Sequence, residues 1–233
     1  MVDRLEPQRF AQVVAAHHRQ HGNPATSLCL ACVDVLEVSG AGLVLMSGAR
    51  SLDFIGVSDR VSDAVEQMEY TLGEGPCIAA FHAKTPVFDA DLADDSTGRW
   101  PQFRRGAVAA GVHAAFGFPL LIGGVCIGAL NLYHTRPGAL TDEQIADAVV
   151  VAECASRSVM SWQAEAPPGT LAWQLEQAPR HGVEVHQATG RISVQVGISV
   201  DDALVLLRAY AFSHDRSIGE VAADVAAGRL RLD

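Results

Sequence analysis

The sequence lacks the features of secreted and membrane proteins. No apolar run approaches the roughly 20 residues that a helix needs to cross a bilayer. The first residues include Asp3, Arg4 and Glu6 instead of the apolar core of a signal peptide. The five cysteines are an odd number and lie among apolar neighbours, which suits a reducing compartment better than a disulfide scaffold. We therefore expect a cytoplasmic protein with no membrane partner.

Positive charge is also scarce. The formal net charge is −10, which argues against capture of nucleic acid by a broad basic surface. Residues 170–233 carry six Arg and eight acidic residues, and the remaining residues carry eleven basic and nineteen acidic ones. Any contact with nucleic acid must therefore depend on a few well-placed Arg and His side chains. Its salt dependence should be modest, because few phosphates are neutralised.

Common catalytic and metal-binding motifs are absent. The chain has no Gly-x-Ser-x-Gly elbow, P-loop, His-Glu-x-x-His or second Cys-x-x-Cys. Cys29 and Cys32 form one such pair, but their spacing on an apolar helix places both thiols on its buried face. His17, His18 and His21 have near-helical spacing without a carboxylate or cysteine to complete a metal site. We expect no catalytic residue, no metal and no resident cofactor.

Cys77 is the one candidate for a reactive side chain. It follows Gly75-Pro76 at a predicted helix start, where aligned N–H groups would lower the pKa of a thiol. With Phe81 in the same short helix, it could sense a ligand or an oxidant inside a pocket. Alternatively, Cys77 is a small apolar residue that fills space after a tight turn, and the pattern favours this second interpretation.

The order of the regular elements predicts an α+β fold. Gly123-Gly124 is the composition of a tight hairpin turn, and Thr141 with Gln144 forms a capping box that opens a long helix. The predicted helices span 4–21, 27–36, 59–72, 78–82, 100–110 and 141–163, and the predicted strands span 43–47, 52–57, 86–92, 112–121 and 126–133. This order predicts a mostly antiparallel sheet with helices packed on its faces.

The last quarter of the chain predicts three short helices. The first spans Val185–Val196 and ends at Gly197. The second begins at Ser199 and the third at Ser217, where Glu220 completes a capping box. Such helices can bury their apolar stripes only against one another, so we expect a small all-α three-helix bundle.

Part of the first of these helices permits a second interpretation. Residues 191–196 alternate with period two and include β-branched residues, which is typical of a strand. However, Val185, Ala188, Ile192 and Val196 form one apolar stripe at helical spacing. We therefore predict a helix over the whole segment.

Several motifs in the first two thirds of the chain resemble those of GAF domains. They are Gly73-Glu74-Gly75-Pro76-Cys77, Pro86-Val87 with Asp91-Leu92, Arg99-Trp100-Pro101, Pro119-Leu120 and Gly128-Ala129-Leu130-Asn131-Leu132. The resemblance covers roughly residues 10–160 and implies an antiparallel sheet that roofs a pocket for a small molecule. We place this sensor domain at residues 1–163, a linker at 164–170, where Pro167-Pro168-Gly169 interrupts helix, and a second domain at 171–233.

The second domain resembles the ANTAR domain, a three-helix RNA-binding module of bacterial antitermination regulators that follows GAF domains in actinobacteria. The resemblance is carried by His186-Gln187-Ala188-Thr189-Gly190, Gln195-Val196-Gly197, Asp202-Ala203-Leu204, Leu207-Arg208, Arg216 and Val221-Ala222. One residue departs from the pattern. Arg191 follows Gly190, where the family usually has an apolar residue.

The resemblance implies that the C-terminal helices bind RNA. Gly190 would let an RNA backbone approach closely, while Gln and Thr side chains can hydrogen-bond base edges. Tyr210 and Phe212 are expected in the core. Arg208 has an alternative role as an ion-pair partner of Asp201 or Asp202. The predicted RNA contacts are His186, Gln187, Thr189, Gly190, Arg191, Arg208, His214 and Arg216.

Taken together, the two resemblances imply a signal-responsive regulator of transcription antitermination. Its GAF domain would detect a small molecule or a redox signal, and residues 4–21 and 141–163 would pair across a homodimer. The two tails would then bind paired RNA hairpin loops. Two alternatives remain open. The chain could be a thiol enzyme of the GAF type, a reductase of free methionine sulfoxide, or its tail could be a module for protein docking or dimerisation.

Overall fold

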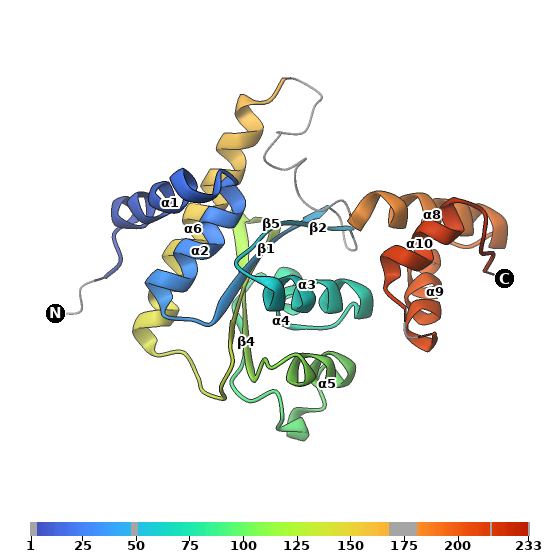
Figure 1. Ribbon diagram of the computed structural model, residues 1–233, viewed down its shortest axis with the longest axis horizontal. Coiled ribbons are helices and arrows are strands. Elements are labelled where there is room, and N and C mark those ends of the chain that lie inside the picture. The colour runs from blue at the N-terminus through green and yellow to red at the C-terminus, as the bar shows by residue number, and fades with distance from the viewer. Residues whose placement is uncertain (1–3, 48–50, 168–180, 215, 233) are drawn as a thin grey trace.

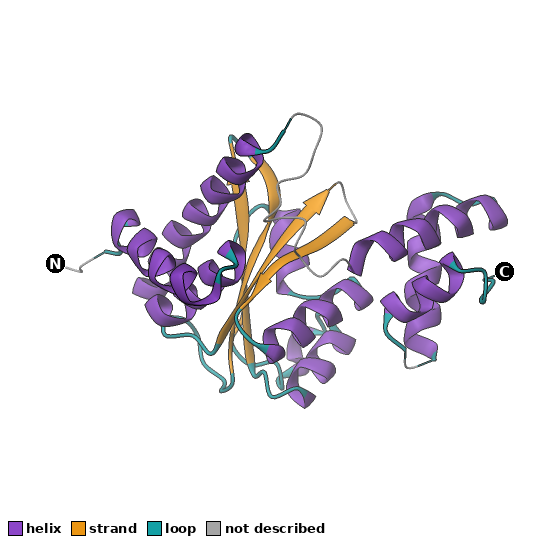
Figure 2. Cartoon of the chain, turned by 45° about the horizontal axis from the view of Figure 1, so that its top comes forward, coloured by secondary structure: helices purple, strands orange, loops and turns teal. Residues whose placement is uncertain are grey.

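A five-stranded antiparallel sheet forms the centre of the larger part of the molecule (Figures 1 and 2). The computed structural model describes residues 4–47, 51–167, 181–214 and 216–232. The strands are β1 Gly40–Ser47, β2 Ser51–Val57, β3 Val87–Asp89, β4 Ala114–Ile122 and β5 Val125–His134, in the order β2-β1-β5-β4-β3. Every pairing of neighbours is antiparallel, as the sequence predicted.

One face of the sheet is covered by α1 Pro7–His21, α2 Pro24–Leu36 and α6 Asp142–Glu165 (Figure 1). Phe116, Phe118, Leu130 and Leu132 are fully buried there and belong to one apolar cluster with residues of all three helices. The capping box of Thr141 and Gln144 is present at the start of α6. Among the described residues, no helix combines the length and apolar character needed to cross a membrane.

The opposite face of the sheet lies against α3 Arg60–Leu72, α4 Pro76–Ala83 and α5 Pro101–Ala109 (Figure 2). A short 3-10 helix, η1 Asp95–Thr97, precedes α5. Several strand residues on this face are small, including Gly42, Ala115, Gly117 and Ala129. Small side chains let α3 and α4 approach the sheet closely, which matters for the site described below.

Three helices follow at the C-terminal end, namely α8 His181–Val196, α9 Val200–Ser213 and α10 Ile218–Ala226 (Figure 1). Residues 191–196 are helical, so the helix prediction is confirmed over the strand alternative. Ser199 and Ser217 cap α9 and α10 by accepting the backbone N–H groups of Asp202 and Glu220. The apolar side chains of the three helices form one buried cluster.

That cluster continues into the sheet domain. It includes Val44 of β1, Tyr70 of α3, Cys77 of α4 and Ala129 of β5. In addition, Arg208 Nε of α9 donates a hydrogen bond to the backbone oxygen of Tyr70 (3.0 Å). The C-terminal helices therefore share part of their core with the sheet domain.

The structure differs from the prediction at some boundaries. β3 is shorter than the predicted strand 86–92, because Asp89 and Asp91 accept the backbone N–H groups two residues on and turn the chain. α6 continues to Glu165, past the predicted start of the linker. Residues 168–170 of that linker and the predicted domain boundary at 171 lie outside the described residues.

A buried arginine holds the segment between β3 and α5. Arg104 is 3% exposed, and its guanidinium group donates to the Asp89 carboxylate. It also donates to the backbone oxygens of Asp91, Asp94 and Arg99 at 3.0, 2.8 and 3.0 Å. A buried charge with this many partners is costly to remove, because the partners are then left unsatisfied.

We therefore expect Arg104→Met to lower the free energy of unfolding by about 3–5 kcal/mol, mainly because the buried Asp89 loses its closest counter-charge and keeps only the longer contact with Arg99 (3.5 Å). Urea denaturation followed by circular dichroism measures this change. Arg105→Met is the matched control, because Arg105 is the next residue of the same helix and is exposed. A loss for Arg104→Met no larger than that of the control would contradict the assignment.

Candidate functional site

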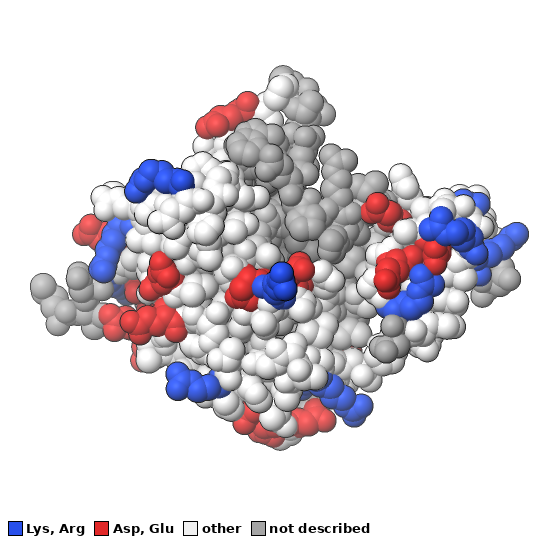
Figure 3. All heavy atoms as spheres, viewed as in Figure 1, with Lys and Arg blue, Asp and Glu red and all other residues white. Residues whose placement is uncertain are grey.

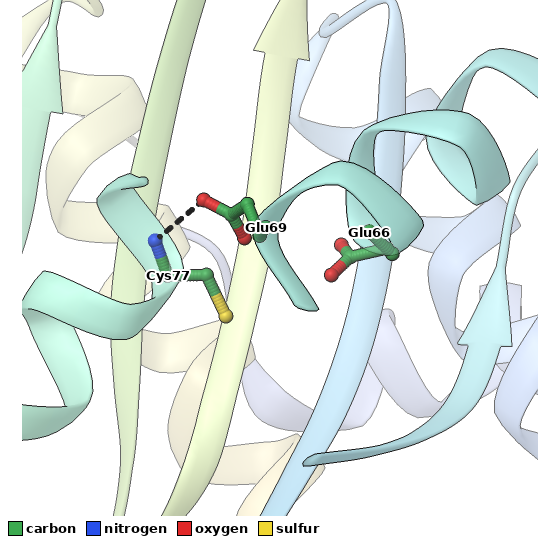
Figure 4. A group of neighbouring side chains, drawn as sticks. All are labelled: Glu66, Glu69 and Cys77. Atoms are coloured by element: carbon green, nitrogen blue, oxygen red, sulfur yellow. Dashed lines mark hydrogen bonds between the residues drawn. The ribbon is translucent and has the colours of Figure 1, made fainter. Parts of the chain in front are cut away.

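A cluster of buried polar side chains lies between the sheet and α3 and α4 (Figure 4). Glu66 and Glu69 are each 1% exposed and lie one helical turn apart on α3. Cys77, also buried, stands at the first turn of α4. In Figure 4 Glu69 lies between Cys77 and Glu66. One ligand atom of each of the three side chains lies within 4.8 Å of the others.

The floor of this cluster is a row of three residues across neighbouring strands. Asn131 of β5 pairs with Gly42 of β1 on one side and with Gly117 of β4 on the other. A Cβ atom at Gly42 would lie 1.9 Å from Glu66 Oε1, and one at Gly117 would lie 2.3 Å from the backbone oxygen of Pro76. The two glycines therefore create the room in which α3 places a carboxylate and α4 begins.

Hydrogen bonds tie Glu69 to both α4 and the sheet. Its Oε1 accepts from the backbone N–H of Cys77 (3.1 Å), and its Oε2 accepts from Asn131 Nδ2 (2.9 Å). Among the residues that the structure describes, Glu66 Oε2 and Asn131 Oδ1 are buried with no hydrogen-bond partner. The cluster thus holds two acceptor oxygens without a donor, although buried polar atoms are usually paired.

Burial dominates the electrostatics of this site. It raises the pKa of Glu66 and that of Glu69, and the charge of Glu66 raises the pKa of Glu69 further. Burial, followed by the charges of Glu69 and Glu66, also raises the pKa of the Cys77 thiol well above its ordinary value. The prediction of a thiol pKa lowered by the helix start is therefore wrong, because burial and two neighbouring carboxylates outweigh the helix dipole.

Phe81 lies on α4 as predicted, half-buried, with its ring edge-on to His82. Cys77 and Phe81 lie one turn apart on the same helix, with the thiol buried and the aromatic ring partly exposed.

A second candidate surface lies on α8. His186, Gln187, Gly190 and Arg191 follow one another at helical spacing on the side opposite the buried apolar residues of this helix. We call these four residues the α8 stripe. A Cβ atom at Gly190 would meet nothing within 4 Å, so this part of the helix backbone is open to an approaching molecule.

A contact with α10 explains why Arg191 occupies a position where an apolar residue was expected. Its Nη1 donates to the backbone oxygen of Ala226 (3.1 Å), the last residue of α10. Backbone oxygens at the end of a helix carry partial negative charge and lack partners within the helix, so a cation there is favourable. The guanidinium group joins α8 to the end of α10.

Two of the predicted RNA contacts have other roles in this structure. Thr189 is 2% exposed, and its hydroxyl donates to the backbone oxygen of Val185 (2.9 Å), so it is not accessible to an external ligand. Arg208 lies against α3, where it donates to the backbone of Tyr70 and its guanidinium carbon lies 5.9 Å from the centre of the Tyr70 ring. Arg208 therefore connects α9 to the sheet domain.

The remaining predicted contacts lie at the end of α9 and beyond it. His214 is exposed and stacks on Tyr210, with ring centres 3.9 Å apart. Arg216 pairs with Asp224 (2.6 Å), which also pairs with Arg229 (2.8 Å). Phe212, expected in the core, is 53% exposed. On the face shown in Figure 3, the Arg side chains of the C-terminal helices lie beside acidic side chains rather than in an unbroken basic surface.

Sequence reasoning missed Glu66, Glu69 and Asn131. A local signal exists for the two acids, because they fall among Val65, Met68 and Leu72 on a helix that must bury one side. Asn131 likewise interrupts a nearly continuous apolar run in β5. Such polar residues at positions predicted to be buried are informative, because they need a partner or a function.

Comparison with known proteins identifies the fold of the sheet domain. The family model of the GAF domain matches residues 15–156. The solved GAF domain of an Acinetobacter phosphoenolpyruvate-protein phosphotransferase is similar, with a TM-score of 0.50 and 12% identity over 70% of this chain and 95% of that one. No curated protein matches the chain.

Two further solved structures are similar at low identity. The GAF domain of a phosphoenolpyruvate-protein phosphotransferase from Coxiella burnetii has a TM-score of 0.48 and 11% identity, covering 69% of this chain and 98% of that one. Free methionine-R-sulfoxide reductase from Neisseria meningitidis has a TM-score of 0.46 and 12% identity, covering 65% and 88%. At such identities a likeness concerns the fold alone.

The buried carboxylates make a prediction about pH. A carboxyl group whose pKa is raised by folding keeps its proton in the folded state at pH values where the unfolded chain has already lost it. The free energy of unfolding therefore falls as pH rises from about 4.5 towards the raised pKa. We expect Glu66→Gln to raise the free energy of unfolding by roughly 1–3 kcal/mol near pH 8 and to have little effect near pH 4. Urea denaturation in buffer with a chelator at both pH values measures the difference.

Glu37→Gln serves as the control for this experiment, because Glu37 is exposed on the loop that follows α2. Its effect should be small and independent of pH. If Glu66→Gln destabilises the protein equally at both pH values, the fold holds the Glu66 carboxyl group in its charged form, and burial does not raise its pKa.

Proposed function

This chain belongs to the GAF domain family, a family of signal-sensing domains, and from this premise we propose that it is a cytoplasmic regulator of transcription antitermination that binds RNA hairpin loops through its C-terminal helices. The observation that carries the proposal is the exposed α8 stripe. It presents His186, Gln187 and Arg191 around the open backbone of Gly190, within the segment that resembles an ANTAR domain.

The chemistry of the stripe supports RNA rather than duplex DNA as the partner. Single-stranded loops expose base edges and faces, which amide and imidazole groups can bind without many phosphate contacts. The exposed rings of Phe212 and His214 at the end of α9 add surfaces on which bases can stack. The mixture of charges on these helices in Figure 3 agrees with recognition by a few contacts.

The contact between α3 and α9 supports a link between sensing and RNA binding. Tyr70 follows Glu69 directly, so one turn of α3 carries both a residue of the buried cluster and the residue that holds Arg208. A ligand that moves Glu69 or Cys77 would therefore also move the surface on which α9 rests. A conformational change in the sensor domain could thus reach the C-terminal helices by direct contact between α3 and α9, without passing through the linker.

Two other functions have weaker support. A thiol enzyme needs an ionised and accessible cysteine, whereas burial and nearby carboxylates keep Cys77 protonated by raising its pKa. A tail that only docks proteins would not require an open glycine among polar side chains. If the wild-type protein recovers only background RNA in the crosslinking experiment below, the result would favour a tail that docks proteins.

The regulator is proposed to act as a homodimer through α1 and α6. Val149 and Met160 of α6 are 40% and 47% exposed. They are three helical turns apart and thus lie on the same side of the helix, with the ion pair of Glu153 and Arg157 between them. An apolar stripe with a central ion pair suits the self-complementary contact of a two-fold dimer.

A pair of glycine variants tests the RNA interface. Gly190→Ala should raise the free energy of unfolding by about 0.5–1 kcal/mol, because Ala is the better helix former and the added methyl meets open space. It should weaken RNA binding about tenfold, equal to ~1.4 kcal/mol, because the same methyl blocks the approaching backbone. The RNA is obtained by crosslinking in cells, and affinity is measured by mobility shift.

Gly219→Ala is the matched control, since a Cβ atom there also meets nothing within 4 Å and Gly219 belongs to α10 instead of the α8 stripe. It should change stability in the same direction and leave RNA affinity unaltered. Equal affinities of wild type and Gly190→Ala would reject the stripe as the interface. Recovery of only background RNA by the wild-type protein would reject RNA binding.

The dimer is tested by light scattering at micromolar concentration. The wild-type protein should show about twice the chain mass of 24.7 kDa. Introducing charge with Val149→Glu and Met160→Glu together should give the mass of one chain, because like charges would face each other across the two-fold axis. Val205→Glu, at a residue that is 55% exposed on α9, should remain dimeric, and a monomeric wild-type protein would exclude this arrangement.

A further inference from the structure

We propose that Glu66, Glu69, Cys77 and Asn131 bind a divalent transition-metal ion of the zinc or ferrous iron class. The two carboxyl groups come from α3, the thiol comes from α4, and Asn131 comes from β5 below them. The proposal concerns the sheet domain alone and does not depend on RNA binding by the tail.

The distances suit a metal ion after small side-chain movements. Oxygen and sulfur ligands bind zinc at about 2.0–2.3 Å, so donor atoms around one ion lie roughly 3.3–3.8 Å apart. Here the donor atoms of Glu66, Glu69 and Cys77 lie within 4.8 Å of one another. Rotation about the side-chain bonds of the two glutamates can supply the remaining movement without displacing the helices.

The unpartnered oxygens point to a cation rather than to a neutral filler. Asn131 is 4% exposed, and its Nδ2 already donates to Glu69, which directs the amide group into the cluster. Its Oδ1 can only accept, Glu66 Oε2 accepts whenever the carboxyl group is ionised, and the described residues offer neither oxygen a donor. A cation satisfies several acceptors at once, and it offsets the repulsion between two buried carboxylates.

The glycines around the cluster support the same inference. Gly75 has a φ of +135°, and a Cβ atom there would lie 2.0 Å from Glu69 Oε1. A Cβ atom at Gly42 would similarly displace the Glu66 carboxylate. The backbone is therefore shaped to admit both carboxylates, which would be better replaced by apolar side chains if the space only needed to be filled.

The donor set selects the class of metal. Carboxylate and amide oxygens alone would suit magnesium or calcium, but a thiolate is a soft ligand that favours zinc, ferrous iron or cobalt. Burial argues in the same direction, because magnesium usually keeps several waters. The Cys77 thiol would lose its proton on binding, as ligands to such metals are deprotonated.

Cobalt binding to the full chain tests the proposal. After removal of metals with a chelator, the protein should bind one equivalent of Co²⁺ and develop the near-ultraviolet charge-transfer band of a thiolate bound to cobalt. Cys77→Ser should abolish this band, and Zn²⁺ should displace the cobalt. Glu66→Gln, which keeps the shape of the side chain, should weaken Co²⁺ binding by at least about tenfold while keeping the band.

Cys126→Ser is the control, because Cys126 is a second, partly buried cysteine outside the cluster. It should bind Co²⁺ with the band unchanged, and circular dichroism should show that all three variants are folded. The site is excluded if no band develops in the wild-type protein at millimolar Co²⁺. It is also excluded if the band survives Cys77→Ser, or if Glu66→Gln binds Co²⁺ as tightly as the wild type.

Discussion

The burial of two carboxylates of one helix against a sheet is the constraint around which the sensor domain is arranged. Removing Glu66 and Glu69 from water is unfavourable, and Asn131 and the start of α4 offset part of this cost by donating hydrogen bonds to Glu69. These contacts in turn require Gly42 and Gly117 on either side of Asn131, since any side chain there would collide with α3 or α4. The positions of α3, α4 and three strands are therefore interdependent, and a change at the buried cluster would shift all of them.

Tyr70 extends this dependence to the C-terminal helices. Its side chain is buried in the cluster that includes residues of α8, α9 and α10, and its backbone oxygen accepts the hydrogen bond from Arg208. Because Tyr70 and Glu69 are neighbours on one turn, the polar site and the contact with α9 cannot shift independently. This is the physical basis for treating the molecule as a sensor that acts on its own tail.

Much of the fold follows from local patterns, whereas the buried site does not. The caps at Thr141, Ser199 and Ser217 are short-range signals, and the helices begin where these residues predict. The sequence also predicted the antiparallel sheet and the GAF family. The role of Asn131 depends on its register with Gly42 and Gly117, and that of Arg208 on a partner 138 residues away. Such pairings arise only from tertiary structure, and no periodicity along the chain encodes them. Thr189 illustrates the same limit, because its polarity suggested an exposed contact while its hydroxyl is satisfied by the preceding turn.

The apolar cluster that unites Val44, Tyr70 and Cys77 with the C-terminal helices has an evolutionary implication. Modules joined only by a linker can be exchanged freely among proteins by recombination. Here the tail rests on a specific surface of α3, so a transplanted sensor would leave Arg208 against a foreign face unless that face were matched. Shuffling of such halves should therefore be accompanied by joint divergence of α3 and α9, and lineages of the two parts should share one history.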